Sequence, residues 1–207
     1  MVTKINIDLT GIIRREILAI FFLIFFSSNS VAGAFGLEMG KKFEDYPSVN
    51  FKKLEGTSYQ VTNIPIPNRL MEMYVVAYTE NTGICFIKGV SKDIATSSYG
   101  TELNTQYNSI SDALNKKYLG SYTREKTNYL QSGSLWNEPR DYMMSLITKE
   151  RYIFTSWEAK SYSSDVAQIF LAQSALSQDE GYIMLEYYGR GWDSCQEEAK
   201  KDDAEGF

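Results

Sequence analysis

The stretch MEMYVVAYTENTGICFIKGV, residues 71–90, decides the fold class of this chain. Its two apolar parts, 71–79 and 84–90, are rich in the aromatic and β-branched residues that favour strands. The ENTG segment between them, residues 80–83, has the composition of a tight turn. We therefore predict a β-hairpin here and an antiparallel sheet around it.

A long helix and a second group of strands are predicted after the hairpin. Between residues 101 and 120, apolar residues recur every three or four positions, which predicts an α-helix with one buried face. A second helix is expected within 136–151, with Asn137 as its cap. The last third predicts strands at 152–159, 166–175 and 182–189, followed by a charged C-terminal helix.

Three weaker signals complete the expected order of elements. A short helix within 35–56 should end near Pro47, because residues before proline avoid the helical region. Residues 58–66 alternate in polarity and run into prolines, which favours a short strand at the edge of the sheet. Residues 121–134 are polar and predict a loop, with room for one added strand.

Neighbouring antiparallel strands with helices set apart from them indicate an α+β fold, in which helices cover one face of an antiparallel sheet. Residues 77–90 and 172–189 share the order strand, acidic turn closing on glycine, strand, and a helix is expected after each. This order favours a duplicated β-β-β-α unit. The alternative is that two unrelated hairpins resemble each other.

Residues 1–34 predict a cleaved secretory signal peptide. A basic start precedes the apolar run 17–26, and small residues follow, so we expect cleavage between Ala34 and Phe35. A membrane anchor is disfavoured, because the ten-residue run rises only about 15 Å as a helix and a span needs about 20 residues. We predict an exported protein with a single mature domain, 35–207, in the bacterial periplasm; an extracellular location is the alternative.

The composition excludes several function classes. The chain has no histidine, which removes histidine-activated nucleophiles and the commonest metal ligand. Its formal net charge is −5, and −6 without residues 1–34, which disfavours nucleic acid and anionic membranes as partners. We expect no cofactor, no metal and no transmembrane span after signal cleavage. Adjacent carboxylates at 44–45 and 179–180 leave a carboxylate-based hydrolase as an alternative.

Cys85 and Cys195 are the two cysteines of the chain. Export would place them in an oxidising compartment, where disulfides form and persist. Two cysteines without histidine make a poor zinc site, and a catalytic thiol would lack its base. We therefore predict a Cys85–Cys195 disulfide.

Aromatic residues are dense in the C-terminal half, and four of them are candidates for a binding face: Tyr182, Tyr188, Trp192 and Trp157. Tyrosine and tryptophan commonly make protein or sugar contacts, and the alternative is that these rings complete the core. The leading hypothesis is a non-enzymatic exported protein that binds another envelope protein. A carboxylate-based hydrolase, a sugar-binding protein and an inhibitor or immunity-type protein are the alternatives.

Overall fold

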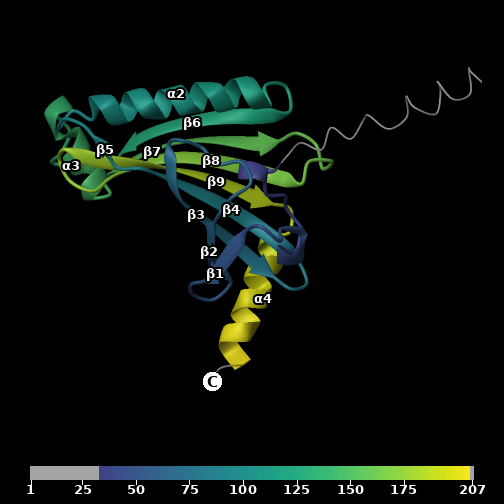
Figure 1. Cartoon of the computed structure of the whole chain (residues 1–207). Coiled ribbons are helices and arrows are strands. Elements are labelled where there is room, and N and C mark those ends of the chain that lie inside the picture. Colours follow the sequence, from purple (N-terminus) through teal and green to yellow (C-terminus); the bar gives the residue numbers. More distant parts are fainter. Residues whose placement is uncertain (1–32, 206–207) are drawn as a thin grey trace, which may run out of the picture. The chain divides into compact units, whose positions relative to one another are not determined.

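An antiparallel sheet of nine strands forms the centre of the protein (Figure 1). The structure, a computed structural model, describes residues 33–205. The strand order is β1-β2-β3-β4-β9-β8-β7-β6, and the short β5 pairs beside β9. The strands are β1 (Asn50–Lys53), β2 (Ser58–Thr62), β3 (Met71–Thr79), β4 (Gly83–Ser91), β5 (Ile94–Ala95), β6 (Tyr122–Leu130), β7 (Arg151–Ala159), β8 (Val166–Ala175) and β9 (Glu180–Gly189).

The predicted α+β class and the central hairpin are confirmed, and two strand predictions are corrected. β3 and β4 pair directly, and β8 and β9 form the second predicted hairpin. β2 is not an edge strand, because β1 pairs along its outer side. Residues 121–134, expected mainly as a loop, contain the nine-residue strand β6. Its charged sequence gives little strand signal, and pairing with β7 along its whole length sets its conformation.

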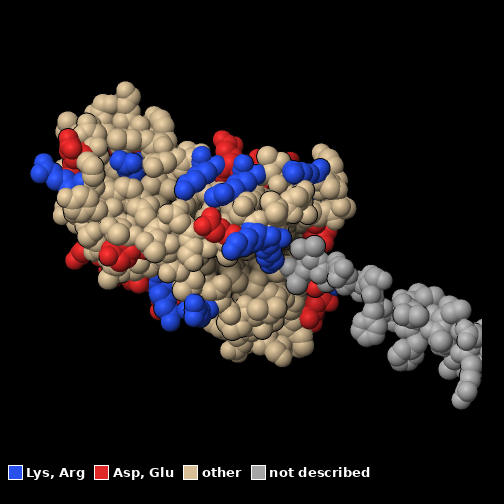
Figure 2. All heavy atoms as spheres, turned by 90° about the horizontal axis from the view of Figure 1, so that it is seen from above, with Lys and Arg blue, Asp and Glu red and all other residues tan. Residues whose placement is uncertain are grey.

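Two helices cover one face of the sheet over β7, β8 and β9. The predicted helix is α2 (Thr101–Tyr118), and its buried Tyr107 shares a 2.7 Å hydrogen bond with Thr155 of β7. The helix expected at 136–151 is much shorter, since α3 is Tyr142–Ile147 and a 3-10 turn at Pro139–Asp141 precedes it. Asn137 lies before this turn and caps neither element. Seen from the α2 side, basic and acidic side chains are interspersed (Figure 2).

The N-terminal segment covers the same face over β1 to β4. Two 3-10 turns, Ala34–Gly36 and Phe43–Asp45, stand where one short helix was predicted. Phe35 packs edge-on against Tyr74, with ring centroids 4.9 Å apart. Gly89 makes this close approach possible, because a Cβ there would lie 2.8 Å from the Phe35 ring. The predicted signal peptide falls almost wholly outside the described residues, so its cleavage stays a prediction.

The last helix, α4 (Trp192–Glu205), lies on the opposite face, and the predicted disulfide holds it there. Cys85 and Cys195 are bonded with their Cα atoms 6.4 Å apart. Ala77 pairs with Phe86 and the next residue, Tyr78, pairs with Ile84, so Cys85 is the extra residue of a β-bulge. Such bulges re-aim side chains, and this one turns Cys85 toward α4.

The order of strands and helices agrees with the proposed repeat, but the placement of the helices differs between its two halves. β2, β3 and β4 precede α2, with the two-residue strand β5 between, and β7, β8 and β9 precede α4; β4 meets β9 in the middle of the sheet. α2 and α4 nevertheless lie on opposite faces (Figure 1). The duplication therefore stays a hypothesis.

Candidate binding face

The face of the sheet opposite α2 is largely uncovered, and we call it the open face. Within residues 33–205, α4 is the helix that packs on this face, and it lies against β3, β4 and Tyr188 of β9. Successive side chains along a strand point to opposite faces of the sheet. The open-face residues are therefore those whose immediate neighbours on the same strand point toward α2 and the N-terminal segment. The positions used below are Met73, Lys88, Val90, Phe154, Phe170, Ala172, Ser174, Tyr182, Met184 and Glu186.

Five apolar side chains cross the open face at right angles to the strands, and we call them the apolar row. Phe154 on β7 stands opposite Ala172 on β8, which stands opposite Met184 on β9. The row continues through Val90 on β4 to Met73 on β3, which is 40% exposed. With strands about 4.8 Å apart, these four steps span about 19 Å. In an antiparallel sheet with one face in water, the side chains on that face are normally polar.

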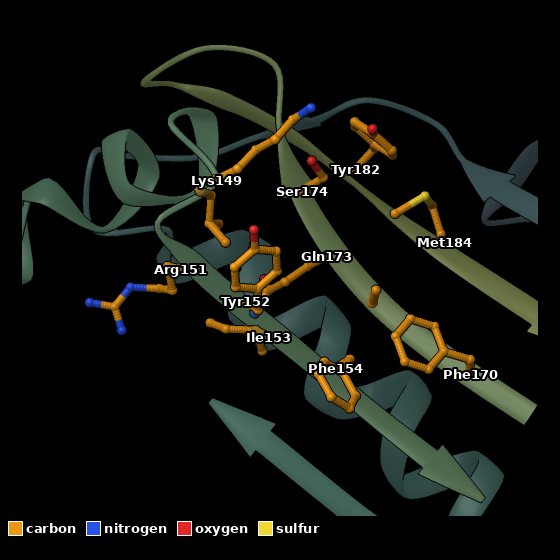
Figure 3. A pocket seen from close by; sticks show the side chains of 12 residues that line it. Lys149, Arg151, Tyr152, Ile153, Phe154, Phe170, Gln173, Ser174, Tyr182 and Met184 are labelled. Atoms are coloured by element: carbon orange, nitrogen blue, oxygen red, sulfur yellow. The ribbon is translucent and has the colours of Figure 1, made fainter. Parts of the chain in front are cut away.

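A pocket of about 350 Å³ lies at the β7–β9 end of the apolar row (Figure 3). It forms where β7 and β8 separate, because their pairing stops at Phe154 and Ala172 although both strands continue. Its volume is within the range of about 300–1,000 Å³ found for small-ligand sites. The side chains that border it on the open face are Tyr152, Phe154, Phe170, Ala172, Ser174, Tyr182 and Met184, with Lys149 at one end.

The charges in the middle of the open face are paired with each other. Lys88 Nζ lies 2.9 Å from Glu186 Oε1, and the hydroxyl of Tyr188 donates a 2.7 Å hydrogen bond to Glu186 Oε2. Burial and this hydrogen bond raise the pKa of Tyr188 above its ordinary value, so its hydroxyl stays protonated at neutral pH. Lys88, Glu186 and Tyr188 therefore supply one another's polar partners beside the apolar row.

The four aromatic residues predicted as a binding face do not form one group. Tyr182 borders the pocket, whereas Tyr188 lies near the other end of β9 and packs against Trp192, with ring centroids 5.5 Å apart. Trp157 is 1% exposed and lies on the covered face, opposite Ile169. It belongs to the core, because positions 154 and 157 on one strand point to opposite faces.

Sequence reasoning missed Phe154 and Phe170, the two phenylalanines of the open face that border the pocket. Their alternation with buried neighbours is visible in the sequence, but β8 reads as a continuous apolar run, which is typical of a strand covered on both faces. Only the positions of α2 and α4 show that one of these faces is uncovered.

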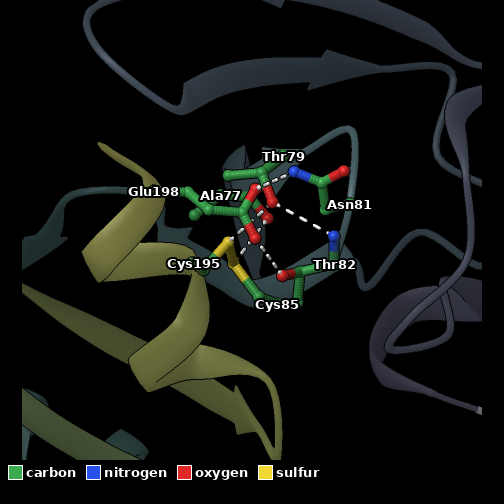
Figure 4. Close-up of a disulfide and its surroundings, with 7 residues drawn as sticks. All are labelled: Ala77, Thr79, Asn81, Thr82, Cys85, Cys195 and Glu198. Carbon is green, nitrogen blue, oxygen red and sulfur yellow. Dashed lines mark hydrogen bonds between the residues drawn. A yellow bond between two sulfur atoms is a disulfide. The ribbon is translucent and has the colours of Figure 1, made fainter. Parts of the chain in front are cut away.

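Polar side chains and the disulfide connect α4 to the β3–β4 turn (Figure 4). Glu198 accepts hydrogen bonds from the Thr82 hydroxyl, at 2.9 Å, and from the Asn81 amide, at 3.2 Å. Interactions with Thr79 and Thr82 hold the pKa of Glu198 below its ordinary value. This carboxylate therefore fastens α4 to the β3–β4 turn, next to the disulfide.

One carboxylate of each adjacent pair singled out in the sequence serves a local turn. Asp45 accepts a hydrogen bond from the backbone N–H of Lys42, and Asp179 accepts one from the Ser177 hydroxyl. Among the residues that the structure describes, no three or more Cys, Asp or Glu side chains gather as metal ligands would. Nor does any helix in the described part of the chain have the length and apolar character needed to cross a membrane.

Comparisons of the chain with protein-family models, with curated proteins and with solved structures found no match.

Proposed function

We propose that this protein is an exported binding protein of the bacterial envelope, without a catalytic role, and that another envelope protein docks on its open face. The observation that carries the proposal is the apolar row, five uncharged side chains aligned across five strands without a covering helix. Contiguous apolar surface of this kind on a soluble domain commonly marks an interaction site.

The chemistry of the pocket favours binding over hydrolysis. Its described lining residues are aromatic, aliphatic, amide, hydroxyl or basic, and none is a carboxylate. Glycoside hydrolysis, the main alternative, uses a pair of carboxylates that flank the bond to be broken. Glu186, the carboxylate nearest the middle of the apolar row, already pairs with Lys88 and Tyr188.

Chemical crosslinking of intact cells, followed by purification of the tagged protein, tests this proposal. The wild type should yield a crosslinked protein partner. Met73→Glu should abolish that product, because it places a charge on the exposed end of the apolar row. Ser109→Glu adds the same charge on the exposed side of α2 and should leave the product unchanged.

Two results would contradict the proposal. One is the recovery of no partner from cells at native protein abundance. The other is an equal yield of the crosslinked product from the wild type and from the Met73→Glu variant, since the partner would then contact another surface.

A further inference from the structure

The pocket has an apolar side and a polar end. Phe154, Phe170 and Met184 line the apolar side, and Met184 stands beside Val90 in the apolar row. At the other end are the Ser174 and Tyr182 hydroxyls, and Lys149 extends from the end of α3 in their direction in the view of Figure 3. An apolar surface that ends in a cation and hydroxyl groups matches a ligand with the same two parts.

The ammonium group of Lys149 is available to a ligand. In the described part of the chain, no salt bridge or side-chain hydrogen bond involves it. Arg151, the other basic residue at the pocket, is already engaged, because it donates hydrogen bonds to Ser145 Oγ at 2.8 Å and to Asn128 Oδ1 at 3.2 Å. Lys149 is therefore the basic group that a bound anion would meet.

The backbone at Lys149 gives a second reason to assign its side chain a role. Its φ is +57°, and it occupies the position after α3 where glycine is usual. The backbone N–H of Lys149 bonds Leu146 O at 3.1 Å and that of Glu150 bonds Ser145 O at 3.0 Å, which is the Schellman pattern. Glycine would adopt this left-handed backbone conformation with less strain, so the end of α3 does not require a lysine at position 149.

A hydrocarbon chain suits the apolar row better than an extended peptide does. The side chains of Phe154, Ala172, Met184, Val90 and Met73 contain no hydrogen-bond donors, and their only acceptors are the weakly accepting methionine sulfurs. A peptide laid on them would bury its own N–H and C=O groups without partners, which is costly, whereas an alkyl chain has no such groups.

We propose that this pocket binds a fatty acid, with its carboxylate at Lys149, Ser174 and Tyr182 and its alkyl chain on the β7–β9 end of the apolar row. The anionic head complements the free ammonium group, and the tail is buried on side chains that offer only apolar contact. This site goes beyond the proposed function, because it requires no partner protein.

Isothermal titration calorimetry on purified, delipidated protein tests the site, with dodecanoate below its micelle concentration as the probe and methyl dodecanoate as the uncharged control. The wild type should bind dodecanoate at least about tenfold more tightly than the ester, since a charge-assisted contact is lost with the ester. Lys149→Gly should lose most of this preference, because only the two hydroxyl groups remain for the carboxylate, and it should unfold at the same or a higher urea concentration. Ala172→Phe, which fills the row between Phe154 and Met184, should weaken both ligands.

Lys116→Gln, a change at an exposed lysine of α2, is the matched control and should bind as the wild type does. The inference is wrong if the wild type gives no saturable heat with dodecanoate, or if Lys149→Gly retains the preference for dodecanoate over the ester. It is also wrong if Lys116→Gln loses that preference, because binding would then follow overall charge. A crosslinked protein partner found without dodecanoate binding would contradict this site and leave the proposed function standing.

Discussion

Phe154 and Phe170 pack against each other on the open face, with their ring centroids 4.9 Å apart and their planes tilted by 30°. Each ring is only partly buried, although both stand on inner strands of the sheet. Aromatic side chains in this arrangement bury part of their surface against each other and leave the rest exposed for contact with a partner. The pair therefore supports the interpretation of the open face as a binding surface.

Trp157 and Phe170 should differ in their effects on stability, although both are large aromatic residues of neighbouring strands. Trp157→Ala removes a fully buried ring beneath α2, so we expect the free energy of unfolding to fall by about 3–5 kcal/mol. Phe170→Ala removes a partly exposed ring, and we expect a loss of about 1 kcal/mol. Urea unfolding of both variants measures the difference. Equal losses would mean that the open face is covered in the native protein.

The Cys85–Cys195 disulfide should contribute a large part of the stability of the domain. It closes a loop with a sequence separation of 110 residues, and constraint of the unfolded chain by such a loop corresponds to about 4–5 kcal/mol. We expect the double variant Cys85→Ser, Cys195→Ser to lose that amount in urea unfolding under oxidising conditions. Wild-type protein treated with dithiothreitol is the control and should match the variant. A loss below about 1 kcal/mol would contradict this role.

Stability should fall at high pH, in part because of Tyr142. Burial raises the pKa of Tyr142 to about 12, compared with about 10 in an unfolded chain. Its contribution is therefore complete below about pH 10 and is lost as the pH rises toward about 12, because the unfolded chain releases the proton first. Tyr142→Phe removes the hydroxyl that donates to Asn104 Oδ1, so it should cost about 1 kcal/mol at neutral pH.

Tyr142→Phe should lose less stability than the wild type between pH 10 and 12, and urea unfolding of both proteins across this range measures the difference. Other buried tyrosines, such as Tyr187, keep part of the slope, because burial raises their pKa values as well. An unchanged slope in Tyr142→Phe would show that this hydroxyl titrates in the same range in the folded and unfolded states.

Export should leave a mature protein that begins at Phe35. The charged start, the apolar run at 17–26 and the small residues up to Ala34 form the signal-peptide pattern. Mass spectrometry of the N-terminal peptide of the natively produced protein measures this directly. Recovery of an N-terminal peptide that still contains Met1 would contradict the prediction and the proposed location.

The parts of the fold that were predicted correctly depend on local patterns. The β3–β4 hairpin has its turn residues between two apolar segments, and α2 has one apolar stripe, so neighbouring residues in the sequence suffice to identify both. The disulfide could be predicted because Cys85 has one possible partner in the chain. β6, in contrast, is a strand because β7 pairs with it, and its sequence of polar and charged residues carries no such information.

The candidate site was harder to predict, because it depends on which face of the sheet is covered. Because side chains alternate along β7, Phe154 and Trp157 point to opposite faces of the sheet. The sequence does not reveal which of them lies beneath α2. The sequence analysis consequently placed Trp157 on the binding face and left out Phe154. Lys149 gave no signal, because its significance depends on the end of α3 lying beside the gap between β7 and β8.

Site-specific photocrosslinking in living cells tests the binding role of the open face most directly. A photoreactive phenylalanine analogue would replace Phe170 on the open face and, as the control, Leu119, which is 77% exposed at the end of α2. We predict a discrete crosslinked protein from position 170 and none from position 119. The same products from both positions, or a product from position 119 alone, would contradict the assignment of the open face as the binding surface.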